Sequence, residues 1–438
     1  MGLRKQLEEA LRKIEELEKQ IEILKQDNVD LKDSIAKLNF TKEIPSFVKL
    51  NRKKRQKKPG QKEGHKGITR PIPNHVDEEV TLKFDRCPDC NTKLSRKPTE
   101  IKERYVEDIR PRRNYHVKKY KIHRSWCPKC KAIKSPKPID VMPKCRFGLY
   151  FLLFVCFQKY GLSLTLNKIQ KELWIYFGLK VSEGEISQTL TRAGRLFGHK
   201  FEELKERIKQ SKYHCEDETG WRINGINYQL WAFIQEEIAL FKIDKSRSHK
   251  VPKKIIGKDY CGTIGSDRFS AYNTLEEKTN CTFQKCWVHI LRNTKKLASF
   301  YDKEGKYLHR RLKQIYKEAK EAEKKNDYEK VPLFIQKIEK LLKRKYEHQE
   351  CKVFVRSIAV RHKYNLFRFV GNPEIKDNNN DVERALRHPV VMRKISGGNR
   401  SSNGARATEV MLSVIKTYQL QNKDFFKEGT NFLQNQFL

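Results

Sequence analysis

The chain has 438 residues, enough for two or three domains that each bury a core. Lys and Arg number 94 against 54 Asp and Glu, and the resulting net charge of +40 predicts a nucleic-acid partner without separating DNA from RNA. The 37% hydrophobic content still suffices for folded domains, and the longest apolar run, residues 149–157, is too short for a membrane span. There is no visible secretory signal, and an odd number of cysteines, eleven, does not suggest a disulfide framework. We therefore expect a cytoplasmic protein with no membrane partner.

An unbroken heptad repeat runs through residues 3–38 and predicts that residues 1–40 form a coiled-coil dimerisation helix. Ile at one seam position and Leu at the other favour a parallel two-stranded coil, in which Asn28 would fix the register and the dimer state. The predicted dimer contacts are Leu7, Ile14, Leu17, Ile21, Leu24, Asn28 and Leu31. The alternative is a lone amphipathic helix that packs on its own domain.

Residues 41–74 form a basic linker in which Pro59 and Gly60 break any helix. Its cations could release counterions from DNA phosphates without reading sequence. The predicted contacts are Arg52, Lys53, Lys54, Arg55 and Lys66. A merely solvated linker is the alternative. A leucine-zipper transcription factor would carry its basic helix before the zipper and without glycines, so the order found here argues against that class.

Two Cys-x-x-Cys pairs lie within residues 75–142, which we expect to form a zinc-binding β domain. Four thiolates can close a tetrahedral Zn²⁺ site, and here they would come from Cys87, Cys90, Cys127 and Cys130. The segment between the pairs alternates like strands, so a hairpin could bring the pairs together. A redox pair would need a different context. The surrounding cations suggest that this domain also touches DNA.

Residues 143–210 have helical periodicity, with an apolar helix at residues 147–157 followed by a helix-turn-helix pattern. Gly178 would end one helix, and Ser182 would cap the next with Glu185 in a capping box. The helix after Ser182 could enter a major groove, but a small helical support domain would give the same pattern.

Strand-like segments begin at Tyr213 and predict an α/β catalytic domain made of residues 211–300 and 365–412. Three strands are expected at residues 212–217, 226–235 and 238–246, with turns at 220–221 and 236–237, and a helix at 249–256 and a fourth strand at 261–269 follow. Asp217 would end the first strand and Asp267 the fourth. If these strands are neighbours, the two carboxylates meet.

A third acid, Glu383, lies on a helix that we expect to open at the motif DNNNDVERALR. Mg²⁺ prefers oxygen ligands and binds through carboxylates together with substrate phosphates. A pair of such ions can activate an attacking hydroxyl and stabilise a leaving oxygen. Each acid alone is unremarkable, so the interpretation depends on the order and context of Asp217, Asp267 and Glu383. Asp377 and Asp381 are close enough in sequence to assist Glu383.

The stretch between the second and third acids is longer than a compact catalytic core needs, and residues 301–364 are expected to form a helical insertion. The insertion could lie over bound DNA or present a solvated face. Residues 413–438 are expected to form a helical tail. Cys286 and His289 have metal-like spacing without a second pair, so packing is the default interpretation. Packing is also the default for Trp287, which could otherwise stack on a base.

A glycine-interrupted basic segment, RKISGGNRSSNGAR, predicts a loop that contacts phosphates, with an ordinary flexible loop as the alternative. Its cations are Arg393, Lys394, Arg400 and Arg406. Arg268 and Arg384, which directly follow two of the acids, are further expected DNA contacts.

Taken together, these motifs resemble the insertion sequence 66 family of transposases, which are DDE-type enzymes. The matching runs are DETGW at 217–221, GSDRFSAYN at 265–273, CWVH at 286–289, DNNxxxER ending at Glu383–Arg384, and ALRHPVVMRKISGGNRSSNGA at 385–405. The heptad start, the PGxxxGHKG linker and the Cys-x-x-Cys pairs are also similar to that family. The resemblance therefore covers nearly the whole chain.

The resemblance implies a multidomain α+β protein with a ribonuclease-H-like catalytic domain, in which Asp217, Asp267 and Glu383 bind Mg²⁺ or Mn²⁺. It implies metal-dependent cleavage at the ends of an insertion sequence, with water as nucleophile, and strand transfer into target DNA by a DNA 3′-hydroxyl. The expected partners are DNA, a second copy in a dimer or larger assembly, and helper proteins of the same element. The expected location is the prokaryotic cytoplasm, on the nucleoid.

Three other interpretations stay open. A non-catalytic, dimeric, zinc-containing DNA-binding protein would explain the charge and the first half of the chain, but it would give the three acids no role. A metal-dependent nuclease or resolvase would cut DNA without joining it. A decayed transposase copy is the third, and the intact acids count against it.

Overall fold

The computed structural model describes residues 2–41 and 147–437, together with positions 115, 117, 125–127, 132–134, 140, 141 and 145. Helix α1 (Gly2–Thr41) is continuous over the predicted heptad segment. The seam residues Ile14, Ile21 and Leu24 are 51%, 49% and 63% exposed. An apolar seam this exposed on a single chain suits a partner helix, and the dimer remains a prediction.

The second Cys-x-x-Cys pair borders a short antiparallel hairpin of β1 (Ser125–Cys127) and β2 (Ala132–Lys134). Cys87, Cys90, Cys130 and the side chain of Cys127 lie outside the described residues. So do the linker cations Arg52, Lys53, Lys54, Arg55 and Lys66. The zinc site and the linker contacts therefore stay predictions.

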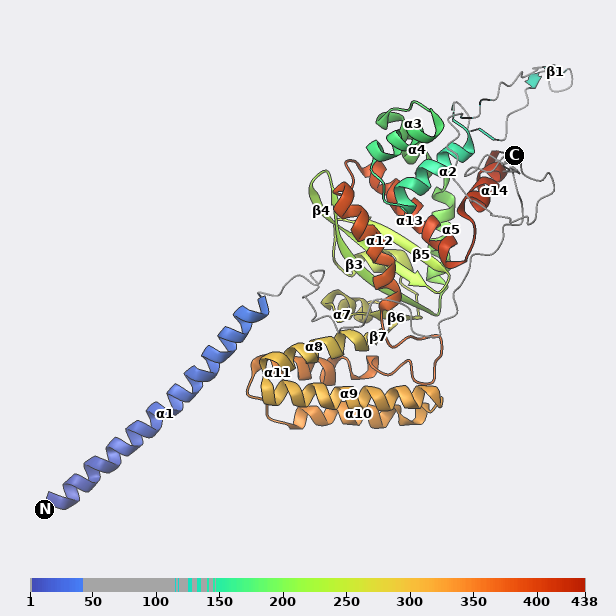
Figure 1. Cartoon of the computed structure of the whole chain (residues 1–438). Coiled ribbons are helices and arrows are strands. Elements are labelled where there is room, and N and C mark those ends of the chain that lie inside the picture. Colours follow the sequence, from blue (N-terminus) through green and yellow to red (C-terminus); the bar gives the residue numbers. More distant parts are fainter. Residues whose placement is uncertain are drawn as a thin grey trace, which may run out of the picture. The chain divides into compact units, whose positions relative to one another are not determined.

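Five strands form one mixed sheet in the order β5–β4–β3–β6–β7 (Figure 1). They are β3 (Tyr213–Ile223), β4 (Ile226–Gln235), β5 (Ile238–Asp244), β6 (Thr263–Ser266) and β7 (Thr282–Lys285). β3, β4 and β5 form an antiparallel meander, whereas β6 runs parallel to β3, and β7 runs parallel to β6. Helices α6 (Lys250–Ile256) and α7 (Ser270–Glu277) lead into β6 and β7. The predicted first and fourth strands are thus neighbours, and β7 is a strand that the pattern did not predict.

The first hairpin differs from the sequence expectation. Gly220 and Trp221 do not form a turn, because both lie inside β3 and pair with β4. The turn lies at Asn224 and Gly225, whose positive φ angles of 49° and 77° suit the two-residue turn that Asn-Gly favours in hairpins. The expectation that Asp217 ends its strand is therefore wrong, since Asp217 lies in the middle of β3.

Besides α6, α7 and α12 (Asn380–Ser396), seven helical segments share one apolar core with the sheet. They are α2 (Leu149–Cys156), the π-helix η1 (Phe157–Gly161), α3 (Leu166–Phe177), α4 (Glu183–Leu196), α5 (Gly198–Lys209), α13 (Ser402–Leu420) and α14 (Phe425–Phe437). Gly178 ends α3, and Ser182 and Glu185 form the capping box of α4, both as predicted. A Cβ on Gly194 of α4 would lie 2.6 Å from the Cα of Ala407 on α13, so these two helices pack closely. This contact and the acidic first turn of α4 favour the support role over insertion into a DNA groove.

Helix α13 covers the outer edge of the sheet at β5. The main-chain N–H groups of Ala239, Phe241 and Ile243 donate to Thr417 Oγ1, Ser413 Oγ and Glu409 Oε1, respectively. Four helical residues advance about 6 Å and two strand residues about 6.6 Å, so every fourth residue of α13 meets every second residue of β5. Edge groups that would otherwise pair with a foreign strand are thereby satisfied.

Beyond β7 the chain forms a helical unit with its own apolar core (Figure 1). Its elements are α8 (Trp287–Phe300), α9 (Asp302–Lys324), η2 (Tyr328–Lys330), α10 (Val331–Glu339), η3 (Lys340–Lys343), α11 (Gln349–Arg356), η4 (Ser357–Arg361) and η5 (Lys363–Asn365). Helix α12 (Asn380–Ser396) follows, carries Glu383 as expected and contacts β3 and β4. No helix among the described residues is long and apolar enough to cross a membrane.

Candidate active site

Asp217 lies in β3, and Asp267 directly follows β6, the parallel strand beside it. β3 and β6 are paired in register up to Cys215 and Gly265. Continued by two residues, the same register sets Asp217 beside Asp267. Because β6 ends at Ser266, the two acids lie where the strands part.

Main-chain groups hold both carboxylates. Oδ1 of Asp217 accepts a hydrogen bond from the N–H of the next residue at 2.9 Å, and Oδ1 of Asp267 accepts one from the N–H of Phe269 at 2.8 Å. From the interior, the fully buried ammonium group of Lys285 on β7 donates to Ser266 Oγ and to the main-chain oxygen of Asp267, both at 3.0 Å. Burial lowers the pKa of Lys285 to about 8, although the charge of Asp267 opposes the shift. Lys285 thereby fixes the backbone that presents Asp267.

The two aspartates lie in an environment with excess negative charge. The pKa of Asp217 is raised to about 8, first by burial and then by the charges of Asp267, Glu218 and Glu383. Glu218 is compensated, because it pairs with Arg247 at 2.7 Å. Within the described part of the chain, Asp217, Asp267 and Glu383 make no ion pair with a Lys or Arg side chain, so a bound cation would relieve their mutual repulsion.

Glu383 joins the pair from the first turn of α12. Asn379 ties this end of the helix to the sheet, since its side chain donates to the main-chain oxygen of Glu216 on β3 at 3.0 Å. The N–H of Asn379 also contacts the Sγ of Cys286 at 3.3 Å. Oε1 of Glu383 is buried, makes no hydrogen bond within the described part of the chain, and lies 3.5 Å from Nε2 of His289.

The two acids that lie near Glu383 in sequence have other partners. Asp377 pairs with Lys320 at 3.1 Å, and Asp381 pairs with Lys376 at 2.6 Å. Glu383 has no Lys or Arg partner among the residues that the structure describes. Among Asp377, Asp381 and Glu383, it is therefore Glu383 whose carboxylate is best placed to bind a cation.

The Cys-Trp-x-His motif, at residues 286–289, contacts the residues that immediately precede α12. The main-chain N–H of Trp287 donates to the main-chain oxygen of Asp377 at 2.9 Å. The Trp287 ring is fully buried and donates to the main-chain oxygen of Leu366 at 2.6 Å, so the core interpretation is correct and the ring is not available to a DNA base. His289 is a site residue that the sequence interpretation missed, although the spacing from Cys286 was a signal that pointed to it.

Asp217, Asp267 and Glu383 lie near one another, but their side chains are not arranged to coordinate one metal ion together. Within the described ranges, no group of three or more His, Cys, Asp and Glu side chains is placed to hold a metal ion. Their chemistry nevertheless suits a hard cation, because Asp217, Asp267 and Glu383 offer only oxygen donors. The raised pKa of Asp217 and the buried, unpartnered oxygen of Glu383 point the same way.

Two of the predicted DNA contacts, Arg268 and Arg384, already have protein partners. Arg268 is partly buried, lies 4.7 Å from the ring centroid of Phe354 and donates to Ser357 Oγ at 3.4 Å. It thereby links the Asp267 loop to the helical unit. Arg384 is exposed and pairs with Asp381 at 2.6 Å, an arrangement that leaves it open to solvent.

The glycine-containing loop is anchored on the hairpin of β3 and β4. A Cβ on Gly398, whose φ is 108°, would lie 2.3 Å from the main-chain oxygen of Arg222, so only glycine fits there. Asn399 accepts a hydrogen bond from Trp221 Nε1 at 2.8 Å, and Arg393 donates to a main-chain oxygen of β3. The loop is therefore a packed element, and Arg393 takes part in its packing.

The remaining cations of this segment divide into two kinds. Lys394 and Arg400 are exposed. Arg406 pairs with Glu202 at 3.0 Å and with Glu409 at 3.1 Å. Arg406 thus connects α13 to α5. Because Lys394 and Arg400 are exposed, they are better placed than Arg406 to contact phosphates.

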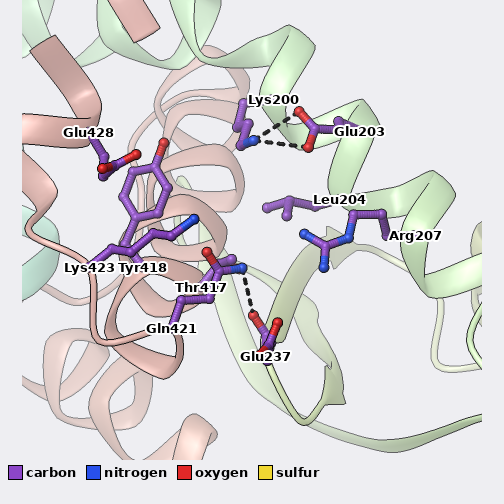
Figure 2. Close-up of a pocket in the computed structure, with 10 residues that line it drawn as sticks. All are labelled: Lys200, Glu203, Leu204, Arg207, Glu237, Thr417, Tyr418, Gln421, Lys423 and Glu428. Carbon is purple, nitrogen blue, oxygen red and sulfur yellow. Dashed lines mark hydrogen bonds and ion pairs between the residues drawn. The ribbon is translucent and has the colours of Figure 1, made fainter. Parts of the chain in front are cut away.

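A separate cavity of about 350 Å³ lies between α5, the turn after β4 and the ends of α13 and α14 (Figure 2). It is lined by Lys200, Glu203, Leu204, Arg207, Glu237, Thr417, Tyr418, Gln421, Lys423 and Glu428. Its three acidic and three basic side chains balance, and none of the three candidate acids lines it. The cavity therefore shows no preference for a polyanion.

The region that holds the three acids matches a known protein family. Residues 144–407 match the family described as Transposase IS66 family. The chain is also similar to an uncharacterized protein, y4hP, of Sinorhizobium fredii, with 23% identity over 402 residues that cover 82% of this chain and 72% of that protein.

Proposed function

The chain belongs to the IS66 family of transposases, and on this basis we propose that it is a DDE-type DNA transposase. It would cleave DNA at the ends of an insertion sequence and join those ends to target DNA. The observation that supports this most directly is that Asp217 and Asp267 each lie two residues beyond the last paired residues of β3 and β6, with Glu383 close enough to raise the pKa of Asp217. The mixed sheet, with its first and fourth strands adjacent, supports a ribonuclease-H-like catalytic domain.

In this proposal Asp217, Asp267 and Glu383 hold Mg²⁺ or Mn²⁺. When bound, a pair of such ions activates the attacking hydroxyl and stabilises the leaving oxygen. Water is the first nucleophile and a DNA 3′-hydroxyl the second, so no Ser or Tyr side chain needs to form a bond to DNA. The protein's own part is to fix three carboxylates, through main-chain hydrogen bonds to the two aspartates and through Asn379 at the start of α12.

DNA binding in this proposal is supported by the net charge of +40. The exposed cations Arg384, Lys394 and Arg400 would contact phosphates, together with the linker cations. A Zn²⁺ ion at the four cysteines would stabilise the domain that precedes the helices. Pairing of α1 would bring two chains together, and helper proteins of the element would complete the assembly on the nucleoid.

A cleavage and joining assay tests the proposal. Purified full-length protein is incubated with duplex DNA that carries an element end, in the presence of Mg²⁺ or Mn²⁺. Cleaved ends that become joined to a second duplex are the expected result. Cleavage without joining would favour a nuclease, and binding without either would favour a non-catalytic DNA-binding protein.

A further inference from the structure

The two helices that follow β7 carry a large excess of positive charge. Residues 287–317 contain nine Lys and Arg side chains but only two acidic ones, Asp302 and Glu304. Both acids are already engaged: Asp302 pairs with Lys306, and Glu304 accepts hydrogen bonds from the main-chain N–H groups of residues 347 and 348. Within residues 287–317 the positive charge therefore exceeds the negative charge, and the other acids of α9, Glu318, Glu321 and Glu323, lie beyond this range.

Many lysines of the helical unit, including two on α9, are neutralised by an acid close to them. These ion pairs are Lys317 with Glu321, Lys320 with Asp377, Lys330 with Asp327, Lys337 with Glu318 and Lys363 with Glu339. Four exposed cations on α8 and α9 differ from them: Arg292, Lys295, Arg310 and Lys313, which we term the basic strip. Within the described ranges none of these four makes an ion pair. A solvated helix face often alternates charges of opposite sign, as the ion-paired lysines of this unit do.

The basic strip begins at the candidate active site. His289, which faces Glu383, lies on the first turn of α8, and Arg292 follows one turn later. The strip thus extends away from Glu383 along α8.

The strip continues from α8 onto α9, which packs alongside it (Figure 1). Thr294 of α8 contacts the ring of His309 of α9 at 2.9 Å. Burial and then the charges of Lys313 and Lys295 lower the pKa of His309, so these two lysines lie near the same ring from different helices. The exposed cations of the strip therefore lie on two helices that pack side by side.

We propose that the basic strip binds the sugar-phosphate backbone of the DNA duplex that leaves the active site, without reading its sequence. The inference rests on the proposed function, because it takes the DNA strand to be anchored at the three acids. Exposed, unpaired Arg and Lys side chains release counterions from phosphates on contact, whereas base recognition would require side chains presented to a groove. The helical unit would then serve as a guide for DNA beside the catalytic sheet.

The test is the salt dependence of DNA binding, measured by fluorescence anisotropy in EDTA so that no cleavage is needed. The triple variant Arg292→Gln, Lys295→Gln, Lys313→Gln is compared with the wild type. Each lost phosphate contact reduces the slope of log K against log salt by about 0.9, which corresponds to about fivefold weaker binding at 0.15 M salt. The triple variant should therefore lose close to 3 from the slope, and Lys295→Arg with Lys313→Arg should retain the wild-type slope.

A matched control removes three exposed cations of the same unit outside α8 and α9, by Lys340→Gln, Lys343→Gln and Lys352→Gln. This control should leave the slope unchanged. Equal slopes for the strip variant and the wild type, or an equal loss in the control, would overturn the inference. If the wild type cleaves DNA while the strip variant binds normally, the inference about the basic strip is wrong and the proposed function stands. If DNA binding depends on the basic strip but the wild type never cleaves DNA, the proposed function fails and the inference about the strip stands.

Discussion

Oε1 of Glu383 lies 3.5 Å from Nε2 of His289, and neither that oxygen nor Nδ1 of His289 has a hydrogen-bond partner among the described residues. The two side chains stand at the starts of α12 and α8, two helices whose ends are joined by contacts of Asn379 with Cys286 and of Trp287 with the main chain of Asp377. His289 is thereby held against the carboxylate of Glu383. We expect it to act as a positioning residue for that acid.

His289→Ala should lower the rate of DNA cleavage about 10- to 100-fold, the usual loss when a group that orients a metal ligand is removed. His289→Gln, which keeps a nitrogen near the position of Nε2, should recover most of the rate. Mn²⁺ binding, followed by electron paramagnetic resonance without DNA, should weaken in the Ala variant and recover in the Gln variant. His199→Ala, at an exposed position on α5, is the control. Unchanged Mn²⁺ affinity in His289→Ala would show that His289 does not position Glu383.

Asp217→Asn should stabilise the metal-free protein, and the gain should grow with pH. The pKa of Asp217 is about 8 in the folded chain, mainly because of burial, against an ordinary value near 3.8. A raised carboxyl pKa means that stability is fully present below the unfolded value and is lost as the pH rises through the folded value. The difference in Tm between variant and wild type should therefore widen between pH 4 and pH 8, by about 2–4 °C for each kcal/mol relieved.

Saturating Mg²⁺ at pH 8 should reverse this difference, because the cation binds only the folded wild-type site. A gain in Tm that is the same at pH 5 and pH 8 would contradict the burial of a charged Asp217. Thermal melts followed by circular dichroism in buffers with EDTA or Mg²⁺ provide the measurement.

Glu409→Ala should lower the free energy of unfolding by about 2–4 kcal/mol. Glu409 is buried on α13 and accepts hydrogen bonds from the N–H of Ile243 at 2.8 Å and from the ammonium group of Lys242 at 2.7 Å. Its loss leaves the buried N–H of Ile243 and the partly buried ammonium group of Lys242 without this acceptor. Urea titration should show the effect, and Gln419→Ala, an exposed position on the same helix, should change stability by less than about 0.5 kcal/mol. Equal stability of the two variants would mean that α13 does not protect the edge.

Purified wild-type protein should contain one Zn²⁺ ion per chain, and Cys87→Ser or Cys127→Ser should release it. Four thiolates close a structural zinc site, so loss of one should unfold that domain. The melting of the catalytic domain should stay as in the wild type. Elemental analysis together with thermal melts would measure both effects, and zinc-free wild-type protein would refute the site.

The sequence predicted those parts of the fold that depend on contacts between residues close together in the chain. Gly178 and the Ser182–Glu185 capping box are local features, and both occur as expected. The predicted hairpin turn at Gly220–Trp221 is wrong, and the turn lies at Asn224–Gly225, where Asn-Gly is the stronger hairpin signal. Strand β7 has only four residues, too few for a clear alternating pattern.

The candidate site, too, could be predicted from the sequence only in part. The order of Asp217, Asp267 and Glu383 along the chain was sufficient to suggest them, and the pairing of β3 with β6 brings the first two together. The roles of Asp377 and Asp381 could not be separated from that of Glu383 by sequence. Their ion pairs with lysines come from tertiary contacts, and so does the approach of His289 to Glu383.

The central claim is that the three acids act together as the catalytic centre. Its most direct test is the cleavage and joining assay on element-end DNA with Mg²⁺ or Mn²⁺, in which the wild type is compared with Asp217→Ala, Asp267→Ala and Glu383→Gln. Asp381→Asn serves as the matched control, because that acid pairs with Lys376 and Arg384 and does not take part in the proposed centre. We predict that products depend on the metal, vanish in all three variants while DNA binding is kept, and persist in the control. Full activity in any one of the three variants would contradict the assignment.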